Sequence, residues 1–169
     1  MEEGVPADAS SLIYLAKGDA FGPLVPVVRR LLVPPAVWFE AVEEGERIKA
    51  PEVPRIRRAE EHDLVARMSL RPSERTEAKR LREQGLGRGE CEALALGARG
   101  RTVVIDEGRG SRVARARGLE PISTLQLVVL ALRGGNLDGR QARELARELA
   151  KFMNVTADVL TAVERRLTR

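Results

Sequence analysis

Four acidic side chains at predicted turns and helix starts are the residues of this sequence best placed to do chemistry. They are Asp8, Glu40, Glu90 and Asp106. In open parallel α/β sheets, ligands bind outside the carboxyl ends of the strands, where the following helices begin. Carboxylates gathered there repel one another, and the usual compensation is a hard divalent cation such as Mg²⁺ or Mn²⁺. Such a cation acidifies a bound water and neutralises phosphate oxygens, which predicts phosphodiester hydrolysis.

Each acid also has an ordinary structural explanation. Asp8 can cap a helix, and Glu90 can interact favourably with the dipole of its own helix. Glu40 can be a solvated helix residue or the partner of an arginine, and Asp106 can begin a turn through Gly108. The prediction of a site therefore depends on where the fold places these acids, since no residue type decides it alone.

The elements that must position these acids follow from the pattern of apolar, glycine and proline residues. Thr102–Asp106 is the best strand of the sequence, because it is a β-branched run that ends in a carboxylate. The stretch 4–7 is a poor strand, since Pro6 cannot donate to a ladder. We predict further strands at 31–33 and 120–122. We predict helices at 9–18, 20–30, from 35 onward, 56–68, 73–84, 90–98, 111–117, 123–133, 138–152 and 156–167.

Strands separated by helices predict parallel pairing with helices on both faces of the sheet. The expected fold class is α/β, a three-layer α/β/α sandwich with a short sheet of four or five parallel strands. Its 169 residues suit one domain over 1–169, with a charged helical insertion at about 55–85 and C-terminal helices at about 138–168. The helix at 73–84 has little apolar surface, and we expect it to be an exposed arm, mobile or packed against a partner.

Composition restricts the function classes only loosely. The formal net charge is +4, from 29 basic and 25 acidic residues, which is compatible with a polyanionic partner but argues for one weakly. The single Cys91 and the single His62 support neither a disulfide nor a ribonuclease mechanism that needs two histidines. No apolar run approaches the roughly 18 residues of a membrane span, and the N-terminus lacks signal-peptide features, so a cytoplasmic location is expected.

The neighbourhoods of the acids resemble those of a known family. Residues 8–17, Asp-Ala-Ser-Ser-Leu-Ile-Tyr-Leu-Ala-Lys, resemble the opening motif of the PIN-domain nucleases. They are most similar to a bacterial and archaeal subgroup related to the toxins of VapBC-type toxin–antitoxin pairs. The other landmarks of that subgroup follow in order at 33–40, 86–96, 104–107, 112–114, 118–119 and 123–125. The resemblance covers nearly the whole chain and is weakest over 55–84.

The resemblance implies a PIN-like α/β/α fold and a Mg²⁺- or Mn²⁺-dependent endoribonuclease. The implied catalytic and metal-binding acids are Asp8, Glu40, Glu90 and Asp106, with Glu92 and Glu107 as additional metal ligands. Ser10 and Thr124 are expected behind these acids, orienting them. Arg109 and Arg112 flank Asp106 and are candidates for contacts with RNA phosphates, although they fit a solvated helix face equally well. The relatives also imply an antitoxin partner and a homodimer.

Three departures from the family pattern keep other interpretations open. Ser11 stands where a proline is frequent, Ser123 replaces a glycine, and Glu107 replaces the second of two aspartates. The Glu107 substitution and the unusual first strand leave an alternative open, a PIN-like scaffold that no longer cleaves and instead binds nucleic acid or protein. A phosphatase or a DNA-directed flap nuclease is a third interpretation. Whether Glu90 or Glu92 is the third acid stays open at this point.

Overall fold

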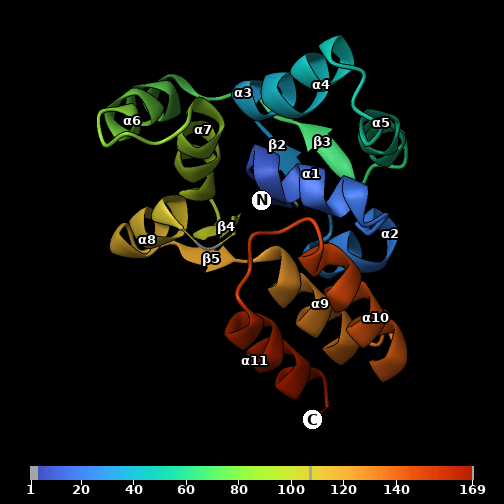
Figure 1. The fold of residues 1–169 in the computed structure, drawn as a ribbon. Coiled ribbons are helices and arrows are strands. Elements are labelled where there is room, and N and C mark those ends of the chain that lie inside the picture. Colours follow the sequence, from blue (N-terminus) through green and yellow to red (C-terminus); the bar gives the residue numbers. More distant parts are fainter. Residues whose placement is uncertain (1–3, 107, 169) are drawn as a thin grey trace.

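The computed structural model describes residues 4–106 and 108–168, which form helices packed on short parallel strands (Figure 1). The elements in chain order are β1 (Val5–Pro6), α1 (Ala9–Lys17), α2 (Phe21–Leu24), the 3₁₀ turn η1 (Val25–Val28), β2 (Leu31–Val33), α3 (Pro35–Trp38), the π-helical turn η2 (Phe39–Glu43), α4 (Glu44–Arg47), α5 (Val53–Glu61), β3 (Val65–Arg67), α6 (Pro72–Arg82), α7 (Arg88–Gly97), β4 (Thr102–Val104), α8 (Arg109–Ala116), β5 (Glu120–Ile122), α9 (Thr124–Arg133), α10 (Gly139–Ala150) and α11 (Ala157–Leu167).

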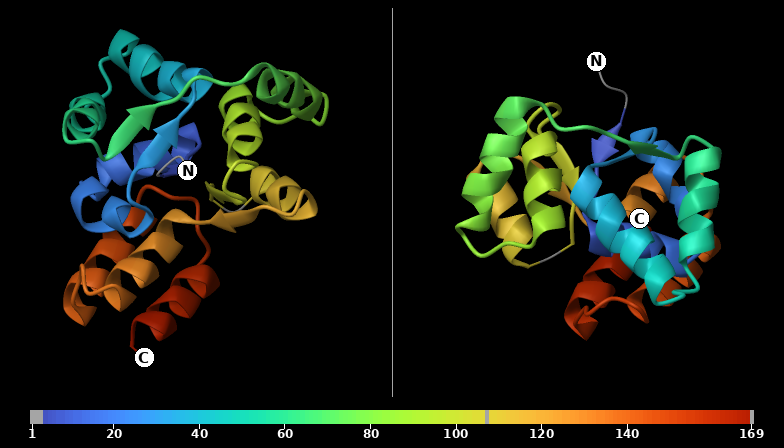
Figure 2. Two further views of the ribbon diagram at one scale, coloured as in Figure 1. Left: turned by 180° about the vertical axis from the view of Figure 1, so that it is seen from behind. Right: turned by 90° about the horizontal axis from the view of Figure 1, so that it is seen from above.

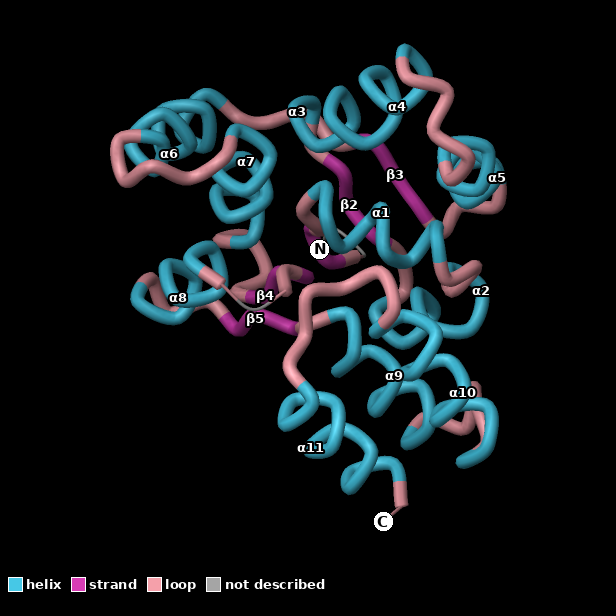
Figure 3. Tube along the Cα trace, viewed as in Figure 1, coloured by secondary structure: helices cyan, strands magenta, loops and turns pink. Residues whose placement is uncertain are grey.

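The strands pair in parallel in two groups that meet at one bridge. β1, β2 and β3 form a three-stranded sheet, and β4 pairs with β5. A parallel bridge between Ala7 and Val104 joins the groups, so the order across them is β3-β2-β1-β4-β5. The predicted α/β class with short parallel strands is confirmed, and Figure 3 shows how little of the chain these strands occupy.

Pro6 is tolerated in the central strand β1 because the backbone N–H that proline lacks would face β4 and not β2. Val5 and Ala7 donate their backbone N–H groups to the carbonyls of β2 and of the residue before it. The nitrogen of Pro6 therefore points toward β4, and β1 reaches β4 only from Ala7 onward. No ladder hydrogen bond is lost at this position, although proline is otherwise rare inside sheets.

The helices gather in three groups around the sheet. In Figure 1, α1 crosses in front of the strands, α3–α5 lie at one end, and α9–α11 lie at the end that carries the C-terminus. The group α6–α8 lies to one side, and the view from above in Figure 2 separates it from α3–α5. The core between them is built from fully buried side chains that include Leu12, Leu15, Leu31, Leu94 and Leu127.

One predicted helix is wrong in its second half. The helix expected at 56–68 ends at Glu61, and Val65–Arg67 forms β3 against β2. The three residues of this strand, Val-Ala-Arg, form no apolar run, and only Val65 is buried. The strand exists because β2 offers unpaired backbone groups on that side, which local sequence does not encode.

The helix expected at 73–84 begins at Pro72 and ends at Arg82, close to the prediction. It packs against α7 through Ala78 and Leu81, which are 7% and 0% exposed. The small apolar face is therefore sufficient to dock it on its own chain. Within the part of the chain that the structure describes, no helix is long and apolar enough to cross a membrane.

Candidate carboxylate site

Asp8 is buried at the junction between β1 and α1. Its backbone N–H donates to the carbonyl of Val104, which ties it to the end of β4. Its side chain caps α1 by accepting from the backbone N–H of Ser11 at 2.9 Å. The capping role proposed from sequence is thus present, but at 5% exposure the carboxyl is far more buried than a helix cap requires.

Asp106 follows β4 and is held by hydroxyl and backbone donors. Thr124 donates its backbone N–H to Oδ1 and its hydroxyl to Oδ2, both at 2.8 Å. The hydroxyl of Ser11 donates to the same Oδ2 at 2.9 Å. Because α9 begins at Thr124 and α1 carries Ser11, two helix starts fix this carboxylate beside the end of β1.

The serine that contacts Asp106 is Ser11, whereas sequence reasoning favoured Ser10. Ser10 is exposed, and Ser11 is fully buried. Residues three apart share one face of a helix, so Asp8, Ser11 and Tyr14 face the same way. This spacing is the signal that could have identified Ser11, and it also points to Tyr14. Thr124, also expected behind an acid, contacts Asp106 through its backbone N–H and its hydroxyl.

Glu90 and Glu92 point to different sides of α7. Glu90 accepts the backbone N–H of Gly87 at 3.0 Å, and a Cβ on Gly110 of α8 would come within 2.7 Å of its Oε1. Glu92 accepts the N–H of Ala36 at the start of α3, at 2.7 Å, and lies 3.7 Å from Arg88. Two residues along a helix are separated by about 200° of rotation. Glu90 therefore faces α8 while Glu92 caps α3.

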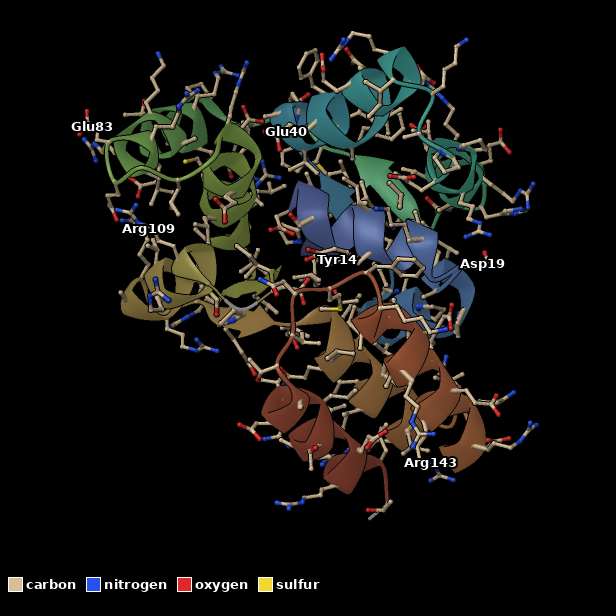
Figure 4. The ribbon with its side chains drawn as sticks, in the orientation of Figure 1. Tyr14, Asp19, Glu40, Glu83, Arg109 and Arg143 are labelled. Carbon is tan, nitrogen blue, oxygen red and sulfur yellow. The ribbon has the colours of Figure 1, made fainter. Side chains whose placement is uncertain are left out.

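Glu40 reaches α7 from a π-helical turn. The helix α3 continues through η2 into α4, and such π turns are frequent at functional sites. The exposed carboxylate of Glu40 accepts the backbone N–H of Gly89 at 3.0 Å. A Cβ on Gly89 would stand 2.6 Å from Oε2 of Glu40, so the close approach depends on that glycine. In Figure 4, Tyr14 lies near the middle of the molecule and Glu40 lies above it, on the side of its helix that faces α7.

The acids act on one another electrostatically. Burial is the main cause that raises the pKa of Asp8 to about 7, and the charges of Asp106 and Glu90 raise it further, while hydrogen bonds from Ser11 oppose the rise. Burial also raises the pKa of the Tyr14 phenol, with added contributions from Asp106 and Asp8. Asp8, Asp106 and Glu90 therefore share one electrostatic environment, and Tyr14 borders it.

The acids match a hard cation in chemistry but do not form a closed binding shell. Among residues 4–106 and 108–168, no group of three or more Asp, Glu, His or Cys side chains lies close enough to hold one metal ion. Their donors are all carboxylate oxygens, which Mg²⁺ and Mn²⁺ prefer. Glu40 and Glu90 are instead held by backbone amides near the start of α7. The donor type thus fits a divalent cation.

Two further expected residues are arginines of α8. Arg109 and Arg112 belong to α8, and a Cβ on Gly85 would come 2.9 Å from Nη1 of Arg109. The guanidinium of Arg109 therefore packs over the turn that precedes α7, as Figure 4 also indicates. Glu107, expected as an additional ligand, lies outside the described residues.

The fold and site define a class of protein: an α/β domain with acids at the carboxyl ends of parallel strands. A family model described as a PIN domain matches residues 5–167. The chain therefore belongs to the PIN-domain family, whose members are generally nucleases, and the resemblance noted in the sequence is confirmed at this level. No curated protein and no solved structure matches the chain.

Proposed function

We propose that this chain is a Mg²⁺- or Mn²⁺-dependent endoribonuclease. The observation that carries the proposal is the convergence of the acids: Ser11 donates its backbone N–H to Asp8 and its hydroxyl to Asp106, and the charge of Glu90 also acts on Asp8. The chain belongs to a family whose members are generally nucleases, and phosphodiester hydrolysis is therefore the activity we assign to this cluster of acids. RNA as the substrate and the toxin-like role rest on the sequence resemblance to the VapC-like subgroup.

Asp8, Asp106 and Glu90 would hold the cation, with Glu40 joining them from η2. A cation bound there supplies an acidic water and neutralises charge on the phosphate oxygens. Ser11 and Thr124 keep Asp106 oriented, because together they donate hydrogen bonds to both of its oxygens. Burial of Asp8 keeps competing water away from its carboxyl and favours its protonated form until a cation binds.

The deciding experiment measures cleavage of an unstructured RNA with Mg²⁺, with Mn²⁺ and with chelator. We expect cleavage only with metal, and we expect Asp8→Asn and Asp106→Asn each to lower the rate by at least about a hundredfold. Asp158→Asn is the matched control, since Asp158 is exposed on the distant helix α11. Metal-dependent cleavage that survives Asp8→Asn would rule out this assignment, and a preference for DNA would redirect it to a deoxyribonuclease.

A second candidate is a PIN-like scaffold that binds nucleic acid or protein without cleaving. It is favoured by one observation, that no three described acids stand close enough to hold an ion. Calorimetry with Mn²⁺ near neutral pH separates the two functions. Binding that disappears in Asp106→Asn supports the nuclease, and an absence of binding supports the silent module.

We also propose an antitoxin partner and a homodimer, from the same resemblance, and a cytoplasmic location. Exposed apolar side chains on the segment that carries Glu40, Phe39 at 47% and Ile48 at 66%, are compatible with a protein partner on that side. Light scattering of the purified chain measures its oligomeric state. Co-purification with the product of a small adjacent gene, together with loss of cleavage in the complex, tests the antitoxin.

A further inference from the structure

A pocket between α6 and α7 gathers cationic side chains. Its volume is about 260 Å³, several times the ~30 Å³ that one water takes in the liquid. Four basic residues line it, together with Leu70, Ala78, Cys91 and Glu92: Arg75, Lys79, Arg82 and Arg88. We call this the α6–α7 groove.

The basic and the acidic side chains of α6 lie on different faces of the helix. Arg75, Lys79 and Arg82 stand four and three residues apart, so they form one stripe along the helix, and this stripe borders the groove. The acids Glu74 and Glu77 face elsewhere. Glu74 pairs with Arg99 at 2.5 Å, and Glu77 pairs with Arg117.

Little negative charge opposes the stripe. Within the described part of the chain, Lys79 and Arg82 form no ion pair, and Arg75 donates to the carbonyl of Leu70 at 2.8 Å. Glu92 is the one acid among the described residues that lines the groove, and it is shared with Arg88 and the N–H of Ala36.

Cys91 and Glu83 add no charge to the lining of the groove. Burial raises the pKa of the Cys91 thiol to about 11, so this wall of the groove is neutral near pH 7. Glu83 follows Arg82 at the outer end of α6 (Figure 4) and is not among the residues that line the groove. The groove therefore carries a net positive charge.

The groove and the carboxylates are joined by the first turn of α7. Arg88 lines the groove, the N–H of Gly89 holds Glu40, and Glu90 belongs to the acidic cluster. Arg88 and Glu90 point about 200° apart on the helix, so the groove and the acids lie on different sides of α7 and approach each other at its first turn. A polyanionic strand whose bond lies at the acids would place its neighbouring phosphates near this turn.

We propose that the α6–α7 groove binds a backbone phosphate of the RNA strand that flanks the bond at the carboxylates. The inference rests on the proposed function, because it takes RNA as the substrate. Guanidinium groups match phosphate oxygens with paired donors, and a lysine adds a compact charge. The small volume suits one phosphate and its sugar rather than the face of a duplex.

The test measures binding without cleavage. The affinity for a short, unstructured, labelled RNA is followed by fluorescence anisotropy in chelator, between about 50 and 200 mM salt. We expect Lys79→Ala with Arg82→Ala to weaken binding about tenfold. The slope of log affinity against log salt should fall by about 0.7, since the groove contacts one phosphate and each single-strand phosphate contact contributes about 0.7.

A charge-matched control uses two arginines far from the groove. Arg143→Ala with Arg166→Ala removes the same charge from α10 and α11, and Arg143 lies at the far end of the molecule in Figure 4. We expect this control to keep the wild-type slope. The charge-preserving pair Lys79→Arg with Arg82→Lys should also retain it, which separates charge from folding.

Binding and cleavage distinguish the two proposals. Equal affinity and slope in the groove variant and the α10–α11 control overturn the groove, as does wild-type protein that binds no RNA. A wild-type chain that binds RNA without cleaving it, and loses binding in the groove variant, retains the groove and overturns the endoribonuclease.

Discussion

At the scale of single residues, Asp8 stands out as a buried carboxyl with a raised pKa. Its carboxyl is buried and its pKa is raised to about 7, chiefly by desolvation and further by Asp106 and Glu90. An aspartate in an unfolded chain has a pKa of about 3.9. Between these two values the folded protein binds a proton that the unfolded chain does not. This contribution to stability is present at low pH and is lost as the pH rises through about 7.

We therefore expect the metal-free protein to lose stability with rising pH in a way that Asp8→Asn removes. From pH 5.5 to 8 the contribution of Asp8 to the free energy of unfolding should fall by about 2 kcal/mol, at 1.36 kcal/mol per pH unit up to the folded pKa. Urea unfolding in chelator measures it. The amide oxygen introduced by this substitution can still accept from Ser11, but the amide cannot ionise, so the variant should be the more stable protein at pH 8.

Asp158→Asn is the control for this measurement, because it removes an exposed carboxylate. It should follow the wild-type pH dependence. If the wild type and Asp8→Asn change in parallel between pH 5.5 and 8, the raised pKa of Asp8 is wrong.

At the scale of elements, the start of α7 connects the parts of the site. Backbone N–H groups at and just before this start hold Glu40 and Glu90, and the helix reaches α3 through Glu92. Gly89 is the tightest point, because Glu40 occupies the space that a Cβ would need. A small change there tests whether the position of Glu40 matters.

Gly89→Ala should lower RNA cleavage by about tenfold to a hundredfold while leaving the fold intact. The added methyl group displaces the carboxylate of Glu40, and misplacement by about 1 Å can cost that much in rate. Glu40 is exposed and can swing away, and alanine suits a helix, so the melting temperature should not fall. Single-turnover cleavage and thermal unfolding are measured on the same samples.

Gly22→Ala is the matched control, since nothing lies within 4 Å of a Cβ at that position of α2. We expect its cleavage rate to equal that of the wild type. A Gly89→Ala protein that cleaves at the wild-type rate would show that Glu40 does not need its present position.

At the scale of the whole molecule, the candidate site lies where separate parts of the chain meet. β1 with α1, β4 with α9, and the start of α7 each contribute one of its acids or the donors that hold them. Mutual repulsion among these acids opposes the folded state, so a cation that relieves it should stabilise the entire fold.

We expect Mn²⁺ to raise the melting temperature of the wild type by several degrees at pH 7.5. Binding to the folded state at a hundred times Kd adds about 2.7 kcal/mol, and each kcal/mol shifts a chain of this size by roughly 2 to 4 °C. Asp106→Asn should abolish the shift and Asp158→Asn should retain it. An equal shift in all three proteins would place the bound ion elsewhere.

Local sequence was enough to predict the elements whose pattern is self-contained. The β-branched run of β4, the apolar run of β2 and the hydroxyl-capped start of α9 each form near the predicted residues. β3 was missed because its residues have no strand pattern and become a strand only by pairing with β2. Asp8, Glu90 and Asp106 were named from sequence, whereas the interactions of Ser11 and Tyr14 with this cluster were not.

By itself, the sequence determined that this chain is an α/β protein of the PIN family with acids at strand ends and helix starts. Only the tertiary structure decided which of those acids share one environment. Glu90 and Glu92 have the same chemistry and neighbouring positions, and the rotation of α7 turns one toward Asp8 and the other toward α3. The side to which α7 turns each acid is set by its packing against α3, α6 and α8, a long-range property that no short stretch of residues encodes.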